Sequence, residues 1–271
     1  MSVIEHPTFS WRRVSALMLR HLYLLRSSPL RLIELCYWPF MNMLMWGFIS
    51  TYLAGQPGGL LQAAGIFLSA VILWEVLIRS NLGLSLSFME ELYSRNLGHL
   101  FISPLRPYEL VAGCVAMSAL RTIFGLIPAA ILTGPLFGYS VFGLGLPLIA
   151  FFFMLSMFGW AFGMLMMGIL IRWGLAAEGF AWAGLFIFMP LAGVYYPLSA
   201  LPDWIEPIAW ALPTAYVFEG MRAIVTEGVV RMDYLLTGLA LNLAYLAVGI
   251  GCFLMMFRIA RTRGLLLSMG Q

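Results

Sequence analysis

The chain has 271 residues, of which 62% are hydrophobic and 10% are charged, and its formal net charge is +3. Soluble domains are about 45–50% apolar and about 25% charged. This composition therefore excludes an ordinary soluble enzyme and indicates a protein embedded in a lipid bilayer. All 15 basic residues are arginines. A phosphate-binding loop of the Walker type and a Schiff-base site both need a lysine, so neither is predicted in this chain.

The N-terminal segment, residues 8–28, is predicted to form an amphipathic helix. Trp11, Val14 and Met18 share one face at helical spacing, whereas arginines such as Arg12 lie opposite. A basic amphipathic helix that carries a tryptophan is typical of a segment lying in the membrane interface. An ordinary helix of the bundle is the alternative interpretation.

Six later stretches are apolar enough to cross a bilayer, since each crossing needs about 20 apolar residues. Only short connections separate most of them, so the sequence predicts a single all-α membrane domain, residues 1–271, with six transmembrane helices. The predicted spans are residues 32–54, 60–88, 108–133, 143–171, 178–196 and 234–257.

The placement of arginines predicts the orientation of these spans. Eleven arginines fall on one side of a six-span layout, whereas acidic residues outnumber two arginines on the other side. Basic residues favour cytoplasmic loops, so we expect both termini in the cytoplasm. The eleven are Arg12, Arg13, Arg20, Arg26, Arg31, Arg95, Arg106, Arg172, Arg258, Arg261 and Arg263.

Residues 198–233, before the last span, are less apolar and contain three prolines, which interrupt helices. We expect two short half-helices that form a re-entrant hairpin on the extracytoplasmic side. The aromatic residues near its start have two interpretations, which are an aromatic belt at the membrane surface and a gate at the outer exit. The candidate gate residues are Tyr195, Tyr196, Pro197, Trp204 and Pro213.

Three charged residues lie inside predicted spans. Glu75 and Arg79 are four residues apart, which suits an ion pair on one helix, and Arg121 is near the middle of the next span. A charge at this depth costs about 2.5–3.5 kcal/mol on insertion scales, so such residues face the interior and find partners. The three residues form either a polar site for an ionic substrate or a network that locks the two spans together.

The segment between the second and third spans, residues 89–107, is expected in the cytoplasm and has a helical pattern that ends at Pro104 and Pro107. An amphipathic helix that joins two membrane helices would act as a lever, because a push on it tilts both. A solvated connector is the alternative interpretation.

Two stretches resemble the permeases of type-2 ABC transporters. The first has an acidic start, a Gly-x-Leu, a Ser-Pro-Leu turn and a Glu-Leu-x-x-Gly that opens the third span. It reads Glu90-Glu91, Gly98-His99-Leu100, Ser103-Pro104-Leu105 and Glu109-Leu110-Val111-Ala112-Gly113. The second, residues 196–222, is similar to the external hairpin before the last helix in that family.

The resemblance implies a bacterial inner-membrane exporter in which two permeases, or one permease and a close relative, form the membrane core. Two separate ATPase subunits would bind ATP and Mg²⁺, so no cofactor is expected in this chain. The cargo would be amphipathic or hydrophobic, such as a drug-like molecule, a lipid or a lipid-linked glycan. Besides these subunits, the expected partners are membrane lipids and not nucleic acid. The residues implied to couple with the ATPase are Glu90, Glu91, Arg95, Gly98, His99 and Leu100.

Two other classes of protein are alternatives to an ABC exporter. An ion-coupled secondary transporter or channel could use Glu75, Arg79 and Arg121 as an ion path. A membrane-embedded enzyme needs paired carboxylates or a His, Cys or Ser constellation at one membrane face, and the sequence suggests none. The three histidines and three cysteines are widely separated, so no metal site is predicted.

Overall fold

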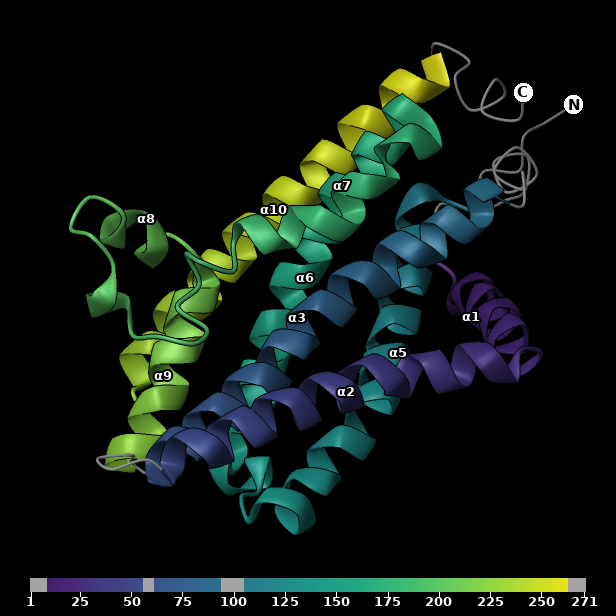
Figure 1. Cartoon of the computed structure of the whole chain (residues 1–271). Helices are drawn as coiled ribbons and strands as arrows, with labels where there is room; N and C mark the ends of the chain where they lie inside the picture. Colours follow the sequence, from purple (N-terminus) through teal and green to yellow (C-terminus); the bar gives the residue numbers. More distant parts are fainter. Residues whose placement is uncertain (1–8, 56–60, 94–104, 263–271) are drawn as a thin grey trace, which may run out of the picture.

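The computed structural model describes residues 9–55, 61–93 and 105–262, and within these ranges the chain is all-helical with no β-strand (Figure 1). The all-α fold class is therefore confirmed. The α-helices are α1 (Trp11–Arg26), α2 (Pro29–Ala54), α3 (Leu61–Tyr93), α5 (Pro107–Phe137), α6 (Leu146–Trp173), α7 (Glu178–Ala183), α8 (Glu206–Trp210), α9 (Pro213–Glu227) and α10 (Met232–Thr262). Short 3-10 turns are η1 (Val141–Leu144), η2 (Gly174–Ala177), η3 (Gly184–Ile187) and η4 (Leu198–Ala200).

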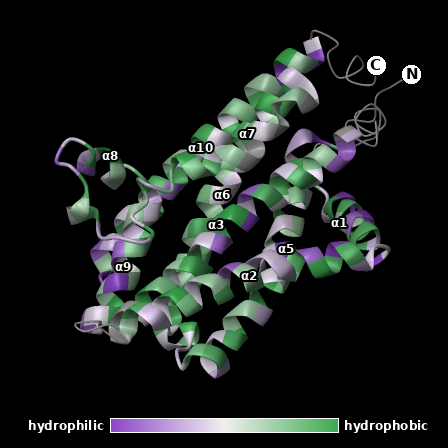
Figure 2. Cartoon of the chain, viewed as in Figure 1, coloured by the Kyte–Doolittle hydropathy of each residue, from purple (hydrophilic) through white to green (hydrophobic). Residues whose placement is uncertain are grey.

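Five of the described helices, namely α2, α3, α5, α6 and α10, are long and apolar enough to cross a membrane. Figure 2 shows that they are hydrophobic over most of their length, whereas hydrophilic residues gather at α1, at α9 and near helix ends. The helices pack as one bundle with α3 and α6 at its centre, and this arrangement matches a multi-pass membrane protein.

The helix α1 and the C-terminal end of α10 lie at the same end of the bundle. A buried apolar cluster there joins residues from five helices, which are Leu17 of α1, Phe88 of α3, Leu110 of α5, Leu170 of α6 and Phe257 of α10. Of the eleven arginines that predict the orientation, all but Arg95 and Arg263 lie in the described ranges, in α1 or near helix termini at this end. We call it the arginine-rich end.

The prediction of a helical span over residues 178–196 is wrong. Only the six residues of α7 are α-helical there, and they are followed by η3 and by turns as far as Tyr196. The cause is local: Pro190 has no backbone N–H for a helix, and Gly193 adopts a left-handed φ of 63°. Six helical spans are therefore not confirmed.

The broken segment nevertheless runs back along α6 from the arginine-rich end. The Phe188 ring packs edge-on against Phe158 and Phe162 of α6, with ring centroids 5.7 and 5.4 Å apart. Gly193 then lies against Arg222 of α9, near the start of α10. The chain thus returns to the far end before α10 begins, by a path that is not a continuous helix.

The predicted N-terminal helix is confirmed as α1, and the face that it buries in the bundle overlaps the predicted apolar face only at Val14. Val14, Leu17 and His21 are buried against the bundle, whereas Trp11 is 75% exposed. The Trp11 ring packs on Phe9, with ring centroids 5.0 Å apart, and not on the neighbouring helices. The opposite face of α1 also exposes large apolar side chains, including Tyr23, which is compatible with a helix at a membrane surface.

The segment before the last helix contains two short α-helices, α8 and α9, as the prolines predict. The first is only five residues long, while α9 extends over 15 residues and packs against α10 and α6. Prolines stand in the first turn of both helices, where the missing N–H costs no helical hydrogen bond.

Close packing of α10 on α6 depends on Gly249. A Cβ atom at this position would lie 2.5 Å from the carbonyl oxygen of Ala161. Gly251 lies two positions further along the same helix and faces another direction. A Cβ atom there would have no other atom within 4 Å. The two glycines therefore offer a matched test of this helix contact.

We predict that Gly249→Val destabilises the protein by about 1–3 kcal/mol, the range for overpacking a tight contact. Gly251→Val should change stability by less than about 0.5 kcal/mol. Thermal unfolding in detergent, followed by circular dichroism, measures both. Equal loss in the two variants would contradict the contact.

Candidate functional site

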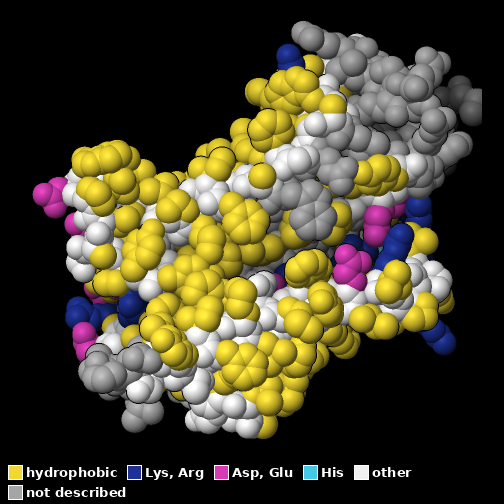
Figure 3. Space-filling view, viewed as in Figure 1, with side chains coloured by type: hydrophobic (Ala, Val, Ile, Leu, Met, Phe, Trp, Pro, Cys, Tyr) yellow, Lys and Arg dark blue, Asp and Glu magenta, His cyan; other side chains and the backbone are white. Residues whose placement is uncertain are grey.

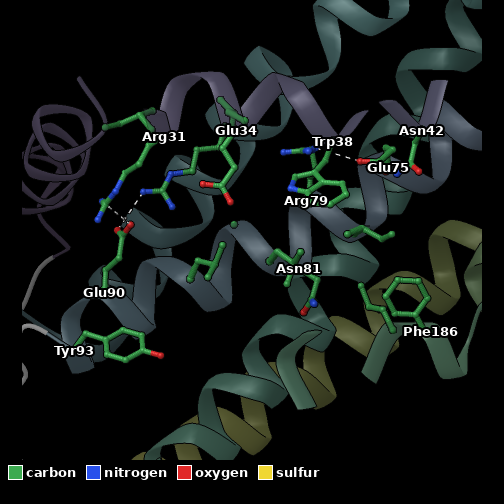
Figure 4. Close-up of a pocket in the computed structure, with 18 residues that line it drawn as sticks. Arg31, Glu34, Trp38, Asn42, Glu75, Arg79, Asn81, Glu90, Tyr93 and Phe186 are labelled. Carbon is green, nitrogen blue, oxygen red and sulfur yellow. Dashed lines mark hydrogen bonds and ion pairs between the residues drawn. The ribbon is translucent and has the colours of Figure 1, made fainter. Parts of the chain in front are cut away.

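A cavity of about 580 Å³ lies between α2, α3 and α5 and is closed in part by η3 (Figure 4). Its volume is in the range of small-molecule sites, about 300–1,000 Å³. Apolar residues form much of its wall, together with six charged side chains, which are Arg31, Glu34, Glu75, Arg79, Glu90 and Arg121.

The α3 helix presents one continuous face to this cavity. Side chains three or four positions apart share a helix face, and the spacing is kept from mid-helix to the last turn by Glu75, Ile78, Arg79, Leu82, Leu86, Glu90 and Tyr93. The face packed against α6 is different, because Ser80 there donates its hydroxyl to Ser156 at 3.1 Å. Polar residues deep in α3 are thus divided between a helix contact and the cavity.

Glu75 and Arg79 form the predicted ion pair, with Arg79 Nε 3.3 Å from Glu75 Oε2. The side-chain amide of Asn42 on α2 also donates to Glu75 Oε1 at 2.6 Å. The Glu75 carboxylate is 4% exposed, so these two donors replace the water it has lost. The pair therefore connects α3 to α2.

Arg121 does not join this pair, and the predicted three-residue network is divided in two. Its Nη2 instead lies 3.2 Å from Oε2 of Glu90, in the last turn of α3. A long arginine side chain at depth extends toward the nearest polar region, and Glu90 lies at the arginine-rich end, where it also pairs with Arg31 at 3.3 Å. The position of Arg121 in the sequence did not reveal this direction.

The two acidic residues at the end of α3 pair with three arginines and lie beside a histidine. Besides the two arginines on Glu90, Arg20 of α1 lies 2.9 Å from Glu91, and Nε2 of His21 lies 3.6 Å from the same carboxylate. The ring of His21 is fully buried, and its Nδ1 lies 3.0 Å from the Leu17 carbonyl, which can only accept. We call these six residues the arginine-rich-end cluster. Because its members come from α1, α2, α3 and α5, it holds four helices together.

The predicted coupling segment overlaps the last turn of α3. Residues 89–93 continue α3, and Glu91 is 1% exposed within the arginine-rich-end cluster, so the helix start proposed at Met89 is wrong. Four of the predicted coupling residues, Arg95, Gly98, His99 and Leu100, lie outside the described residues. Their role remains a prediction.

The five predicted gate residues differ in exposure and in the contacts that they make, and their role as a gate remains a prediction. The Tyr195 ring stacks on Trp46 of α2 with centroids 4.3 Å apart, and the Tyr196 hydroxyl donates to the Pro190 carbonyl. Pro197 is exposed before η4, Trp204 is 73% exposed before α8, and Pro213 is buried at the start of α9.

Arg222 of α9 organises this region and was missed. Its Nη2 donates to the Gly193 carbonyl at 2.6 Å and to Glu219 at 2.9 Å, and Glu219 also accepts from the Leu198 backbone N–H at 2.8 Å. These bonds fix the broken segment to α9. The arginine three residues after a glutamate, in a largely apolar segment, was the available sequence signal.

Glu109, in the first turn of α5, was also missed as a structural residue. Its fully buried carboxylate accepts from the backbone N–H groups of Ser10 and Arg106, at 2.9 and 3.1 Å, and from Arg13 Nε at 2.8 Å. The hydrogen bond to Glu109 raises the pKa of the Arg13 guanidinium above its usual value. The start of α1 is thereby held on the start of α5, and the acidic residue just after Pro107 was the signal.

In the part of the chain that the structure describes, no three His, Cys, Asp or Glu side chains are grouped so that they could hold a metal ion. The site is instead a cavity with apolar walls and charged groups, enclosed by apolar helices that are long enough to span a bilayer. These features define a multi-pass membrane protein with a partly open cavity whose apolar wall carries six charged side chains.

The family model described as ABC-2 type transporter matches residues 16–226. Since the match extends over more than half of the chain, the chain belongs to the ABC-2 type transporter family, and the resemblance seen in the sequence is confirmed. It is a transmembrane permease of an ABC transporter, in a family of membrane transport subunits that typically work with an ABC ATPase. A comparison with curated proteins finds no match.

We predict that Glu75→Gln destabilises the protein by about 3 kcal/mol. The substitution leaves the buried Arg79 guanidinium without its counter-charge. Glu75→Gln combined with Arg79→Gln should lose less than the single variant. The same changes in the exposed Glu227 and Arg231, which are 3.8 Å apart, should cost less than about 1 kcal/mol. Thermal unfolding of all variants in detergent measures the difference, and additive losses at Glu75 and Arg79 would contradict the pairing.

Proposed function

We propose that the chain is the permease of a bacterial ABC exporter and that the cavity between α2, α3 and α5 receives an amphipathic or hydrophobic cargo. A drug-like molecule, a lipid or a lipid-linked glycan fits this description. ATP and Mg²⁺ are bound and used by separate ATPase subunits, since this chain has no lysine for a phosphate-binding loop.

The observation that carries the proposal is the position of the cavity along α3. One face of this helix lines the cavity from Glu75 to Tyr93. Residues 94–104, the stretch that resembles the family's coupling segment, follow directly in the sequence. A force applied to that stretch acts on the last turn of α3, and therefore on the arginine-rich-end cluster and the cavity wall.

The arginine-rich end faces the cytoplasm in this proposal, so both termini are cytoplasmic and the protein lies in the bacterial inner membrane. Basic residues gather at this end in α1 and at helix ends, which is the asymmetry that sets membrane topology. A second permease copy, or a close relative, completes the membrane core. Figure 3 shows a broad hydrophobic surface over one face of the bundle, available to lipid or to such a copy.

An ion-coupled transporter or channel is the second candidate. Its support is the charged pair Glu75 and Arg79 at membrane depth. It would need these residues and Arg121 to form one ion path, and Arg121 pairs with Glu90 instead. The geometry therefore favours the exporter.

We predict that Arg95→Glu combined with His99→Glu reduces association with the ATPase, or its stimulation by cargo, by about tenfold, because two charges in the coupling segment are changed. Copurification from detergent, with mass spectrometry and ATPase assays, measures this loss. Arg231→Glu, at the opposite end of the bundle, is the control and should retain full activity.

Two results would contradict the exporter assignment. One is full cargo-stimulated ATPase activity in the Arg95 and His99 double variant, which would reject the coupling segment. The other is transport by the purified chain alone, driven by an ion gradient without ATP, which would favour the second candidate.

A further inference from the structure

The charges around the cavity are unevenly paired at its end near the arginine-rich-end cluster. Arg79 has Glu75 to itself, whereas Arg31 and Arg121 share the single carboxylate of Glu90. The sixth charged residue of the lining, Glu34, is exposed and makes no ion pair or hydrogen bond with any described residue, although its charge acts on Arg79 across the cavity lining. The cavity thus combines two arginines that share one carboxylate with a second carboxylate, that of Glu34, which no described side chain binds directly.

One of the two arginines that share Glu90, Arg121, has a hydrogen-bond donor without an acceptor. Arg121 is only 9% exposed, and its Nε has no acceptor in the described part of the chain. A buried donor without a partner is destabilising because it has lost its water and gained no acceptor, so an acceptor supplied by a ligand would be favourable here. Arg31 is accessible as well, since 49% of its side chain is exposed. Two guanidiniums that line one cavity suit a phosphate or carboxylate group.

The Glu34 carboxylate belongs to the helical turn of α2 that follows Arg31. Arg31 and Glu34 are three residues apart on α2, and positions at this spacing are about 5–6 Å apart. They do not pair with each other, because Arg31 is directed toward Glu90. Figure 4 shows both along α2, followed by Trp38, with Glu90 and Arg79 on α3 across the cavity.

The surroundings of Glu34 suit a ligand ammonium group attached to an apolar body. Trp38, one turn further along α2, lines the cavity with 58% of its surface exposed, and an indole face attracts ammonium groups. The adjoining wall is apolar and is formed by Leu35, Ile78, Leu82, Leu185 and Phe186.

We propose that this cavity binds an amphiphile with a zwitterionic headgroup. The anionic group lies on Arg31 and Arg121, the ammonium group lies on Glu34 and Trp38, and the apolar chain lies along the wall formed by α3 and η3. The assignment of this amphiphile as cargo rests on the proposed exporter function. The binding itself is a property of this chain alone.

Ligands of a single charge fit less well. A purely anionic headgroup on the two arginines would place its charge beside the Glu34 carboxylate, which repels it. A purely cationic amphiphile would satisfy Glu34 but leave the Arg121 Nε without an acceptor and would face three guanidiniums in the same cavity. Only a headgroup that carries both charges matches the three arginines and three glutamates of the lining.

Native mass spectrometry of the purified chain tests the proposal with phosphatidylethanolamine and phosphatidylglycerol of identical acyl chains. We expect phosphatidylethanolamine to bind at least about fivefold more tightly. Glu34→Gln should weaken its binding about tenfold, the effect of losing one charge-assisted contact, and should leave phosphatidylglycerol binding unchanged or stronger. Arg31→Gln should weaken the binding of both lipids.

Matched controls are Glu227→Gln and Arg231→Gln, which make the same changes in an exposed pair away from the cavity; neither should affect either lipid. Equal binding of the two lipids to the unaltered chain, or unchanged preference in Glu34→Gln, would overturn the proposal. Since Glu34 and Arg31 are exposed, these variants are expected to fold.

A second measurement separates this inference from the exporter function. If the ATPase copurifies but the chain binds phosphatidylethanolamine no more tightly than phosphatidylglycerol, only the headgroup inference fails. If the preference is found but no ATPase associates, only the exporter assignment fails. In the assembled complex, phosphatidylethanolamine should stimulate ATP hydrolysis, and the stimulation should be lost in Glu34→Gln; binding without stimulation would reject this lipid class as cargo.

Discussion

The arrangement of this protein depends on the need to pair charged side chains inside an apolar bundle. A charge that is removed from water is retained only where counter-charges and hydrogen bonds replace the lost solvation. At the end of α3, Glu90 and Glu91 meet this condition by binding basic residues from α1, α2 and α5. The same contacts fix the position of α1 on the bundle and the direction of Arg121, so the shape of the cavity follows from how the charges are paired.

This pairing gives a physical connection between the coupling segment that follows α3 and the proposed cargo cavity. A chain of packed and hydrogen-bonded groups can transmit a change only if it has alternative arrangements. The arginine-rich-end cluster has this property, because two arginines share Glu90 and either can move without leaving the carboxylate bare. A displacement of the last turn of α3 would redistribute these contacts and change the charge that faces the cavity. Cargo binding at Arg31 or Arg121 would act on the same contacts in reverse, as linkage requires.

The sequence was sufficient for features that depend on composition over long stretches, and insufficient for those that depend on side-chain direction. Long apolar runs predicted the five long helices, and motif spacing predicted the family. The apolar run at 178–196 also predicted a helix, but two residues, Pro190 and Gly193, decided its backbone. Similarly, Arg121 and Glu75 are close in the predicted layout, yet a flexible side chain several ångströms long selected Glu90 instead.

Arg31 and Glu34 show why the ligand-binding part of such a site is difficult to recognise from sequence. Near the start of a membrane span, both residues are ordinary flanking charges, and a mutual ion pair at this spacing would be the simplest expectation. Only the fold shows that Arg31 is drawn to α3 and that Glu34 is left facing a cavity. A pair that neutralised itself would have little affinity for a charged headgroup. By separating the two charges before any ligand arrives, the bundle keeps both available in the geometry that binding needs, and this preorganisation lowers the cost of recognition.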